Sequence, residues 1–408
     1  MLGAGAVGTV SALKFVQDAM LEQLVIADAV SARASLLTDR LHDPRVSSRR
    51  LEAGDRAALI RTLRETGTTL VLNAALPATN LDVMRACLAA DCDYIDMASG
   101  GSDDDGIPKL EDQFALDAEF RAAGRIALLG MGADPGTTNV YAAYAAKHLF
   151  DEITELCVRD GDNSVCQGHD GFVAAFSPWV FIDECLCRAV AYRDGCYRLE
   201  PPLTGAEPFD FPELGVLNCY YVDHEESKTL PRFFPTARVV DFKMCMDEVT
   251  VETLRVMKRL GLSAKDRVRV GDTTVVPRDV VVSLLPQPKD LAGRMRGKTC
   301  VGILARGYRK GTPRACYIYN VADHEAAYAE LGVQATAYQT GIPPVIAARL
   351  LHEGRWSGPG VRSPEEFDPD PFLERLAREG MPWHVREDTS GSEMPKLRLR
   401  PSQEIVAA

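Results

Sequence analysis

Three glycines near the start of the chain, Gly3, Gly5 and Gly8, form the pattern G-x-G-x-x-G, which suits the binding of a nucleotide diphosphate. The first permits a tight turn from strand to helix, the second lets the backbone approach a pyrophosphate, and the third lets the next helix pack closely on the sheet. The N–H groups that open that helix, at Ala6 and Val7, carry partial positive charge and attract phosphate. We therefore predict that Gly3, Gly5, Ala6, Val7 and Gly8 bind a dinucleotide cofactor.

Asp28 is a further candidate for this cofactor, because it lies 20 residues beyond Gly8. Residues 9–23 predict a helix and residues 24–27 predict a short buried strand, so that Asp28 falls at the end of the strand. A carboxylate in this place receives the hydroxyls of the adenine ribose. The alternative is that Asp28 is only a polar strand end, but the glycines, helix, strand and acid occur in the order that ribose recognition requires.

The first 130 residues alternate strand and helix signals, which is typical of an open parallel sheet with right-handed crossovers. Further strands are predicted at residues 69–74, 93–97 and 126–129, and helices at residues 57–65, 81–90 and 110–123. Ligands bind beyond the carboxyl ends of such strands, which places Ala75, Leu76 and Pro77 beside the cofactor. Asp96 ends another strand and could steer an amine or take a proton; alternatively, it caps a turn or holds the nicotinamide ribose.

From about residue 151 the composition changes to strand-like stretches that are richer in Tyr, Val and Cys, which predicts a second domain with a mixed sheet. His169 lies between glycines in a loop early in this domain. Such a loop can close over a cleft, and histidine titrates near neutral pH, so we predict His169 as a general acid or base. The alternative is an exposed loop histidine without a catalytic role.

Three more polar residues are candidates for contact with a substrate. Asp134 precedes Pro135 at the start of a predicted helix, where it suits either a helix cap or a substrate ligand. Asn139, one turn into that helix, could also contact substrate. Glu184 falls in an apolar, cysteine-containing helical segment, and could bind a substrate amine or pair with Arg188 at i+4.

Composition excludes several classes of protein. The net charge of −12 argues against a nucleic-acid partner, and no apolar run approaches the ~20 residues that span a bilayer. The eleven cysteines contain no C-x-x-C pair, and no basic and apolar leader is visible, which together favour the cytoplasm. Only Met1 and Leu2 precede the glycines, so we expect a very short first strand with residues missing upstream.

Several segments together resemble the saccharopine dehydrogenase-like family, which includes saccharopine reductases, lysine 6-dehydrogenases and carboxynorspermidine dehydrogenases. Beyond the glycine motif, the resemblance rests on residues 73–77 (NAALP), 94–96 (YID), 132–136 (GADPG), 319–325 (YNVADHE), 338–343 (YQTGIP) and 368–372 (DPDPF). The segment DPGTTN at residues 134–139 is much more specific than the glycine motif, and the resemblance covers nearly the whole chain.

The expected fold class is therefore α/β, with an N-terminal Rossmann domain, a doubly wound parallel sheet, and a second α+β domain with a mixed sheet. We expect the Rossmann domain at residues 1–130, completed by C-terminal helices from residues 336–385. The substrate-binding and dimerisation domain is expected at residues 131–335, and a loose tail at residues 386–408. A homodimer is implied by the resemblance.

The resemblance implies an NAD(P)-dependent oxidoreductase that acts on the C–N bond of a lysine- or polyamine-derived amino acid. A saccharopine dehydrogenase or reductase is the first choice, with lysine 6-dehydrogenase and carboxynorspermidine dehydrogenase as alternatives. A cofactor-binding protein without turnover is an alternative of another class. Saccharopine has three carboxylates and requires at least two well-placed Arg or Lys residues, whereas a free substrate amine favours an acidic pocket.

The resemblance also bears on the cofactor and on His324. Family members that use NADP tend to have Ser-Arg after the second strand, where this chain has Ala27 and Asp28. A carboxylate there would repel a 2′-phosphate, so we expect NAD, although Arg33 keeps NADP possible. His324 lies in one of the resembling segments and is expected either to contact substrate or to pack in the core or a subunit contact. Its acidic neighbours are too close in sequence to bind a metal with it unaided, so no metal is expected.

Overall fold

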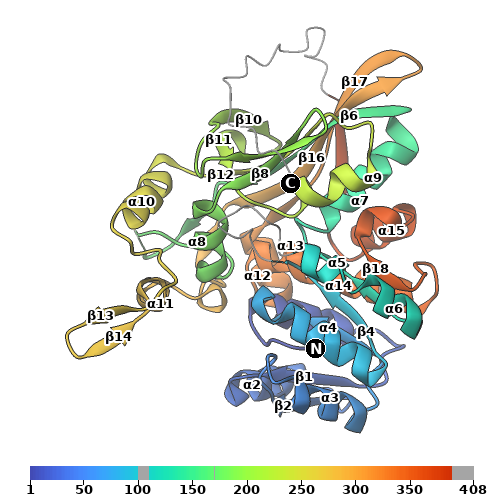
Figure 1. Cartoon of the computed structure of the whole chain (residues 1–408), viewed down its shortest axis with the longest axis vertical. Coiled ribbons are helices and arrows are strands. Elements are labelled where there is room, and N and C mark those ends of the chain that lie inside the picture. The colour runs from blue at the N-terminus through green and yellow to red at the C-terminus, as the bar shows by residue number, and fades with distance from the viewer. Residues whose placement is uncertain (100–109, 170, 388–408) are drawn as a thin grey trace.

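The structure is a computed structural model that describes residues 1–99, 110–169 and 171–387. It contains two α/β units, the first drawn mainly in blue and the second mainly in green to orange (Figure 1). The first unit has a parallel sheet and the second a larger mixed sheet. This arrangement confirms the predicted fold class.

The first unit is a parallel sheet in which Leu2 takes the place of a whole central strand. Its strands are β1 (Leu24–Asp28), β2 (Val46–Arg50), β3 (Leu70–Asn73), β4 (Asp93–Asp96), β5 (Ile126–Leu128) and β18 (Gly360–Arg362). Leu2 forms parallel bridges to Ala27 in β1 and to Asn73 in β3, and so joins β2–β1 to β3–β4–β5–β18. The N–H of Leu2 donates to the carbonyl of Leu72 at 2.9 Å, and the N–H of Gly3 donates to that of Ala27 at 2.8 Å. The glycine turn therefore starts at the centre of the sheet.

The helices of this unit differ in detail from the prediction. They are α1 (Ala6–Phe15), α2 (Ser31–Leu41), α3 (Arg56–Glu65), η1 (Pro77–Thr79), α4 (Asn80–Ala90), α5 (Leu110–Phe114) and α6 (Asp117–Ala123). The first helix ends earlier than predicted, because the guanidinium of Arg45 donates to the carbonyls of Val16, Asp18 and Leu21. The strand β2 was not predicted, since its sequence VSSRR has almost no apolar pattern.

The second unit is a nine-stranded mixed sheet whose main path runs β10–β11–β12–β6–β16–β17–β19, with β8 and β9 attached at β12. These strands are β6 (Glu152–Asp162), β8 (Ala189–Arg193), β9 (Cys196–Glu200), β10 (Glu207–Phe211), β11 (Gly215–Tyr221), β12 (Val239–Cys245), β16 (Lys298–Arg309), β17 (Thr312–Asp323) and β19 (Trp383–Glu387). One face carries Val158, Phe242 and Ile303, which belong to the main core shared with the first unit. The opposite face carries a separate apolar cluster with Phe211, Cys219 and Tyr317.

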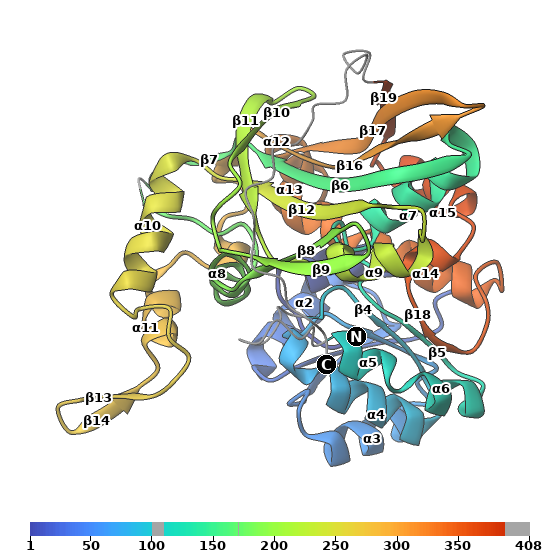
Figure 2. The same ribbon diagram turned by 45° about the horizontal axis from the view of Figure 1, so that its top comes forward.

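Helices and short segments connect and cover this sheet. They are α7 (Thr137–Tyr144), the π-helical turn η2 (Ala145–Leu149), β7 (Val165–Cys166), α8 (Pro178–Leu186), α9 (Glu226–Phe233), α10 (Glu248–Arg259), β13 (Val268–Val270), β14 (Thr273–Val275), α11 (Pro277–Leu284), η3 (Pro288–Asp290), β15 (Met295–Arg296) and α12 (His324–Leu331). Figure 2 shows that α10, α11 and the β13–β14 hairpin project sideways from the body.

The chain then returns to the first unit through α13 (Ala335–Gly341), α14 (Pro343–His352), η4 (Pro364–Glu366) and α15 (Asp370–Arg378). The hydroxyl of Ser11 in α1 donates to the carbonyl of Gly341 in α13 at 2.8 Å, and β18 pairs with β5. Of the tail predicted at residues 386–408, Arg386 and Glu387 end β19, and residues 388–408 lie outside the described residues. Among the described helices, none has the length and apolar character needed to cross a bilayer.

Candidate active site

The glycine turn has the shape that a dinucleotide requires. Gly3 has φ +91°, and a Cβ on it would lie 2.4 Å from the carbonyl oxygen of Ala74. A Cβ on Gly8 would lie 2.2 Å from the carbonyl oxygen of Gly3, so that the turn and α1 are packed without room for a side chain. Gly5, by contrast, faces open space, with no atom within 4 Å of its Cβ position. As the N-cap of α1, Gly5 also leaves the first N–H groups of the helix without a side-chain cap.

The carboxylate of Asp28 lies against this turn. Its Oδ2 accepts the N–H of Ala4 at 2.9 Å, and its Oδ1 accepts the N–H of Val30 at 2.8 Å. These bonds fix the carboxylate at the tip of β1 next to the glycine turn. Ala75 follows β3 on the other side of Leu2, and its N–H donates to Oδ1 of Asn73 at 3.2 Å. The residues predicted for cofactor contact, including Leu76 and Pro77, thus follow the strands on either side of the glycine turn.

Asp96 is a hub of hydrogen bonds at the end of β4. Its Oδ1 accepts the N–H of Gly130 at 2.6 Å. Its Oδ2 accepts the amide of Gln113 at 2.7 Å, the hydroxyl of Tyr94 at 2.9 Å and the amide of Asn80 at 3.2 Å. Burial raises the pKa of Asp96 to about 7. These hydrogen bonds of Asp96 connect the ends of β4 and β5 with α4 and α5.

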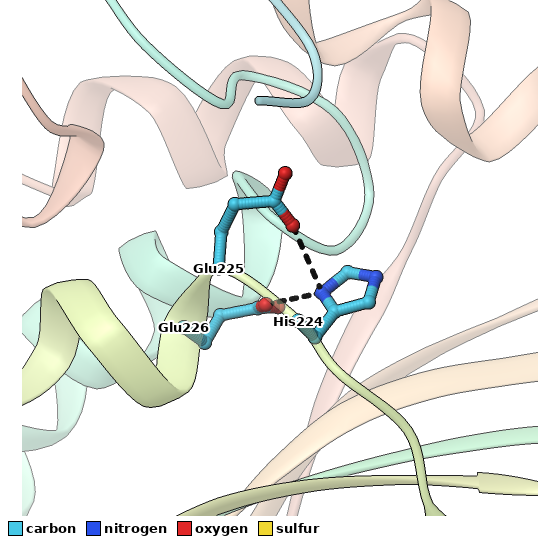
Figure 3. A group of neighbouring side chains, drawn as sticks. All are labelled: His224, Glu225 and Glu226. Atoms are coloured by element: carbon cyan, nitrogen blue, oxygen red, sulfur yellow. Dashed lines mark hydrogen bonds and ion pairs between the residues drawn. The ribbon is translucent and has the colours of Figure 1, made fainter. Parts of the chain in front are cut away.

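His224, Glu225 and Glu226 form a buried cluster where the first unit meets the mixed sheet (Figure 3). Nδ1 of His224 lies 2.5 Å from Oε2 of Glu226 and 3.6 Å from Oε2 of Glu225. The imidazole stacks on Phe242 of β12 with 3.8 Å between ring centroids. Burial lowers the pKa of His224, but the nearby carboxylates of Glu226 and Glu225 outweigh this effect and raise the pKa well above its usual range.

This cluster joins the two units directly. Oε1 of Glu225 accepts both the N–H and the hydroxyl of Ser99, just beyond β4, at 2.5 and 2.9 Å. Oε1 of Glu226 accepts the hydroxyl of Thr138, at the start of α7, at 2.7 Å. The cluster therefore lies beyond the carboxyl end of a Rossmann strand, where ligands of such sheets bind.

Three more carboxyl groups are buried around the cluster, at Asp134, Asp160 and Glu184. Burial raises the pKa of Glu184 to about 8 and that of Asp160 to about 7. Burial also raises the pKa of Asp134, and the nearby carboxyl group of Asp160 raises it further. Oδ2 of Asp134 and Oε2 of Glu184 are buried without a hydrogen-bond partner. Five carboxyl groups thus lie around the imidazolium of His224, while a sixth, Asp223, is paired with the buried ammonium of Lys228 at 2.9 Å. A cationic ligand would stabilise this arrangement.

The structure corrects two sequence interpretations near this cluster. Asp134 is not the helix cap, since α7 begins at Thr137 and the side chain of Asn139 accepts the N–H of the cap residue Gly136 at 2.9 Å. The alternative partner of Glu184 was also wrong, because Arg188 lies beyond the end of α8 and donates to the carbonyl of Leu199.

The remaining predicted contacts lie in different surroundings. The amide nitrogen of Asn139 donates to Thr229 at 3.1 Å and to Glu365 at 3.0 Å, so its polar atoms serve the packing of α7. His169 is half-buried in the loop before α8, with Nε2 3.3 Å from the carbonyl of Phe172. His324 is buried at the start of α12, where burial lowers its pKa.

Sequence reasoning missed His224, Glu225, Glu226 and Asp160. The sequence does contain a signal: four ionisable residues in succession, Asp223 to Glu226, follow an apolar strand in the domain predicted to bind substrate. Their convergence with Glu184 was not readable, since these residues come from three separate elements.

Comparisons with known proteins agree with this geometry. Residues 1–128 match the family described as saccharopine dehydrogenase NADP binding domain, and residues 132–381 match the saccharopine dehydrogenase C-terminal domain. Carboxyaminopropylagmatine dehydrogenase of Synechocystis sp. is 34% identical over 386 residues, covering 94% of this chain and 96% of that protein. Carboxynorspermidine synthase of Vibrio cholerae is 34% identical over 405 residues, covering 95% and 96%.

Two solved structures share the fold at low sequence identity. Saccharopine dehydrogenase (L-Glu forming) of Saccharomyces cerevisiae has a TM-score of 0.70 at 15% identity, over 95% of this chain and 99% of that one. A homospermidine synthase of Legionella pneumophila in complex with NAD has a TM-score of 0.69 at 16% identity, over 98% and 94%.

Proposed function

The chain belongs to the saccharopine dehydrogenase family and is an NAD(P)-dependent dehydrogenase; from this premise, we propose that its substrate is an amino acid built on a polyamine. In this reaction a hydride moves at the carbon of the C–N bond that links the carboxyl-bearing part to the amine chain. The curated relatives from Synechocystis and Vibrio cholerae are named for carboxyaminopropylagmatine and carboxynorspermidine, which are both derivatives of this chemical class.

The observation that carries the proposal is the excess of buried carboxyl groups around His224. Glu225 and Glu226 face it, and Glu184 has an unpartnered carboxyl oxygen. Protonated amines of a polyamine would satisfy this charge, whereas the three carboxylates of saccharopine would meet repulsion. The site therefore favours the polyamine alternative over saccharopine as substrate.

The glycine turn and Asp28 are the residues proposed to hold the cofactor. The open space at Gly5 and the uncapped start of α1 fit a pyrophosphate. When bound, a nicotinamide supplies or accepts the hydride. Glu225 and Glu226 would orient the substrate amine. Glu184 could exchange a proton with the substrate, because its pKa of about 8 lies near neutrality.

Three finer assignments also stay proposals. NAD is favoured over NADP because the carboxylate of Asp28, fixed beside the glycine turn, would repel a 2′-phosphate. His169 and Asp96 are kept as catalytic candidates, with the alternative that Asp96 holds the nicotinamide ribose or caps the turn beyond β4.

We also propose a homodimer and a cytoplasmic location for the enzyme. Two copies are expected to associate, as the resemblance implies. The cytoplasm is expected because all eleven cysteines are free thiols.

Absorbance at 340 nm tests the proposal. Carboxynorspermidine, carboxyaminopropylagmatine, saccharopine and lysine would each be supplied with NAD⁺ and with NADP⁺. We expect a carboxylated polyamine to have a kcat/KM at least about tenfold above that of saccharopine. Equal or higher activity with saccharopine would overturn the substrate assignment. Cofactor binding without turnover of any of the four would favour the binding-only alternative.

A further inference from the structure

His224 has one ring nitrogen that the carboxyl cluster leaves without a partner. Nδ1 bonds Oε2 of Glu226 at 2.5 Å, and the ring stacks on Phe242 with an angle of 6° between the two planes. Nε2 points away from both glutamates in Figure 3, and it makes no hydrogen bond to the described residues. The imidazole is therefore held in place at Nδ1, while its opposite edge is available to a ligand.

This ring is suited to be a fixed cation. A carboxylate oxygen only accepts, so Nδ1 supplies the proton of the bond to Glu226. Burial lowers the pKa of His224, but the carboxylates of Glu226 and Glu225 outweigh burial and raise the pKa well above its usual range. An imidazole that stays protonated at neutral pH is a poor acid or base, but both of its nitrogens remain donors. Nε2–H is thus a charged donor without an acceptor.

Glu225 presents the opposite charge beside this ring. Its Oε1 accepts the N–H and the hydroxyl of Ser99, and its Oε2 lies 3.6 Å from Nδ1 of His224. In the part of the chain that the structure describes, this Oε2 accepts no hydrogen bond. The side chains of His224 and Glu225 are only 7% and 4% exposed. Because water screens such a site weakly, both side chains would interact strongly with the charges of a bound ligand.

Two other buried cations beside the cluster are already paired with carboxylates. Lys228 bonds Asp223 at 2.9 Å, and Arg278 bonds Asp183 on α8 at 2.8 Å. Their side chains are 1% and 5% exposed. A carboxylate that enters the site therefore finds a more available donor in Nε2–H of His224.

We propose that His224 binds the carboxylate of the substrate through Nε2–H, while Glu225 binds the ammonium group on the same carbon. An α-amino-acid group carries these two charges on one carbon, and the two neighbouring residues present the complementary charges. This role rests on the proposed function and deepens it, because it makes His224 the residue that distinguishes a carboxylated polyamine from a plain one.

Calorimetric titration of the native chain and of H224Q with two ligands tests this role. The ligands are carboxynorspermidine and norspermidine, which differ only by the carboxylate, and the reduced dinucleotide is present so that no hydride moves. In H224Q the dissociation constant of carboxynorspermidine should rise about 30-fold, as the loss of one charged hydrogen bond would produce. That of norspermidine should stay unchanged or fall, because a positive charge has been removed. A merely structural role would weaken the binding of both ligands.

The carboxamide of carboxynorspermidine gives a second test, which needs no substitution. The native chain should bind this amide about 30-fold more weakly than the acid, whereas H224Q should bind the two nearly equally. H148Q is the control, since His148 also pairs with a carboxylate, Asp370 at 2.7 Å, but at the surface. Its affinities should equal those of the native chain. Circular dichroism and thermal melting establish that both variants are folded.

Equal losses for both polyamines in H224Q, or an amide that the native chain binds as tightly as the acid, would overturn the role of His224. A loss confined to kcat in the 340 nm assay would also overturn it, because His224 would then act on a proton rather than on the carboxylate. These outcomes leave the substrate assignment intact. A native chain that prefers saccharopine would instead overturn the proposed function, and the role of His224 with it.

Discussion

The glycine turn and the buried carboxyl cluster differ in the groups that they offer to a ligand. The turn offers backbone N–H groups, with glycines where side chains would collide and open space at Gly5. The cluster offers side-chain carboxyls around one imidazolium, brought together from β6, α8 and the start of α9. The residues of the glycine turn lie in one short stretch of sequence. The carboxyl cluster, by contrast, forms only when distant parts of the second domain fold together.

The largest effect is expected from a substitution in the carboxyl cluster. Replacing Glu226 by Gln removes a charge that faces His224 at 2.5 Å and keeps nearly the same shape. We expect kcat/KM for carboxynorspermidine to fall about 10²- to 10³-fold, the usual cost of breaking a buried charge pair, with cofactor affinity nearly unchanged. E22Q, at an exposed position, is the matched control. An unaltered kcat/KM in E226Q would show that the cluster takes no part in the reaction.

The second effect concerns the glycine turn. A methyl group at Gly5 meets no protein atom, so G5A should fold normally and yet obstruct the approach of the pyrophosphate. The dissociation constant of the preferred dinucleotide should rise about 30-fold, measured by the quenching of protein fluorescence. G54A, in a turn that also has nothing within 4 Å, should bind like the native chain. Native affinity in G5A would mean that the cofactor does not approach here.

The third effect sharpens the cofactor assignment. In D28A the carboxylate that accepts the N–H of Ala4 is lost, and with it the repulsion of a 2′-phosphate. We expect the ratio of affinities for NAD⁺ and NADP⁺ to shift about tenfold toward NADP⁺, as the loss of one charged hydrogen bond would produce. Equilibrium titration with both cofactors gives the ratio. No shift, or a shift toward NAD⁺, would show that Asp28 does not discriminate between them.

The smallest effect concerns pH. Burial raises the pKa of Asp160 to about 7 and that of Glu184 to about 8, so both lose their protons between about pH 6 and 9. An ammonium beside them lowers these pKa values, so that binding releases protons and strengthens as pH rises. The dissociation constant of norspermidine should fall about 3- to 10-fold from pH 6 to pH 8. Calorimetry in buffers of different ionisation enthalpy measures the released protons; proton uptake would contradict the assignment.

The local geometry of the glycine turn was predictable from the sequence, because its parts follow one another along the chain. Gly3 to Gly8 and Asp28 needed only a local pattern, and the structure brings them together as that pattern implies. The polar edge strand β2 was missed because it lacks apolar alternation. The early end of α1 was missed because its cap, Arg45, comes from a distant segment.

The carboxyl cluster was only partly predictable. Asp134 and Glu184 were identified as candidates, but the residues nearest the imidazolium were not. His224, Glu225 and Glu226 follow β11, whose position in the mixed sheet depends on pairing with β12, a strand that lies beyond α9 in the chain. Non-local pairing of this kind leaves no periodic signature in one sequence.

A crystal structure of the chain with the oxidised dinucleotide and carboxynorspermidine is the most direct test of the central claim. We expect the pyrophosphate to lie against the N–H groups of Ala6 and Val7, and a substrate nitrogen to lie within about 3.2 Å of a carboxyl oxygen of Glu184, Glu225 or Glu226. A substrate whose amines all lie away from these three carboxyls, with the cluster left in its own hydrogen bonds, would contradict it.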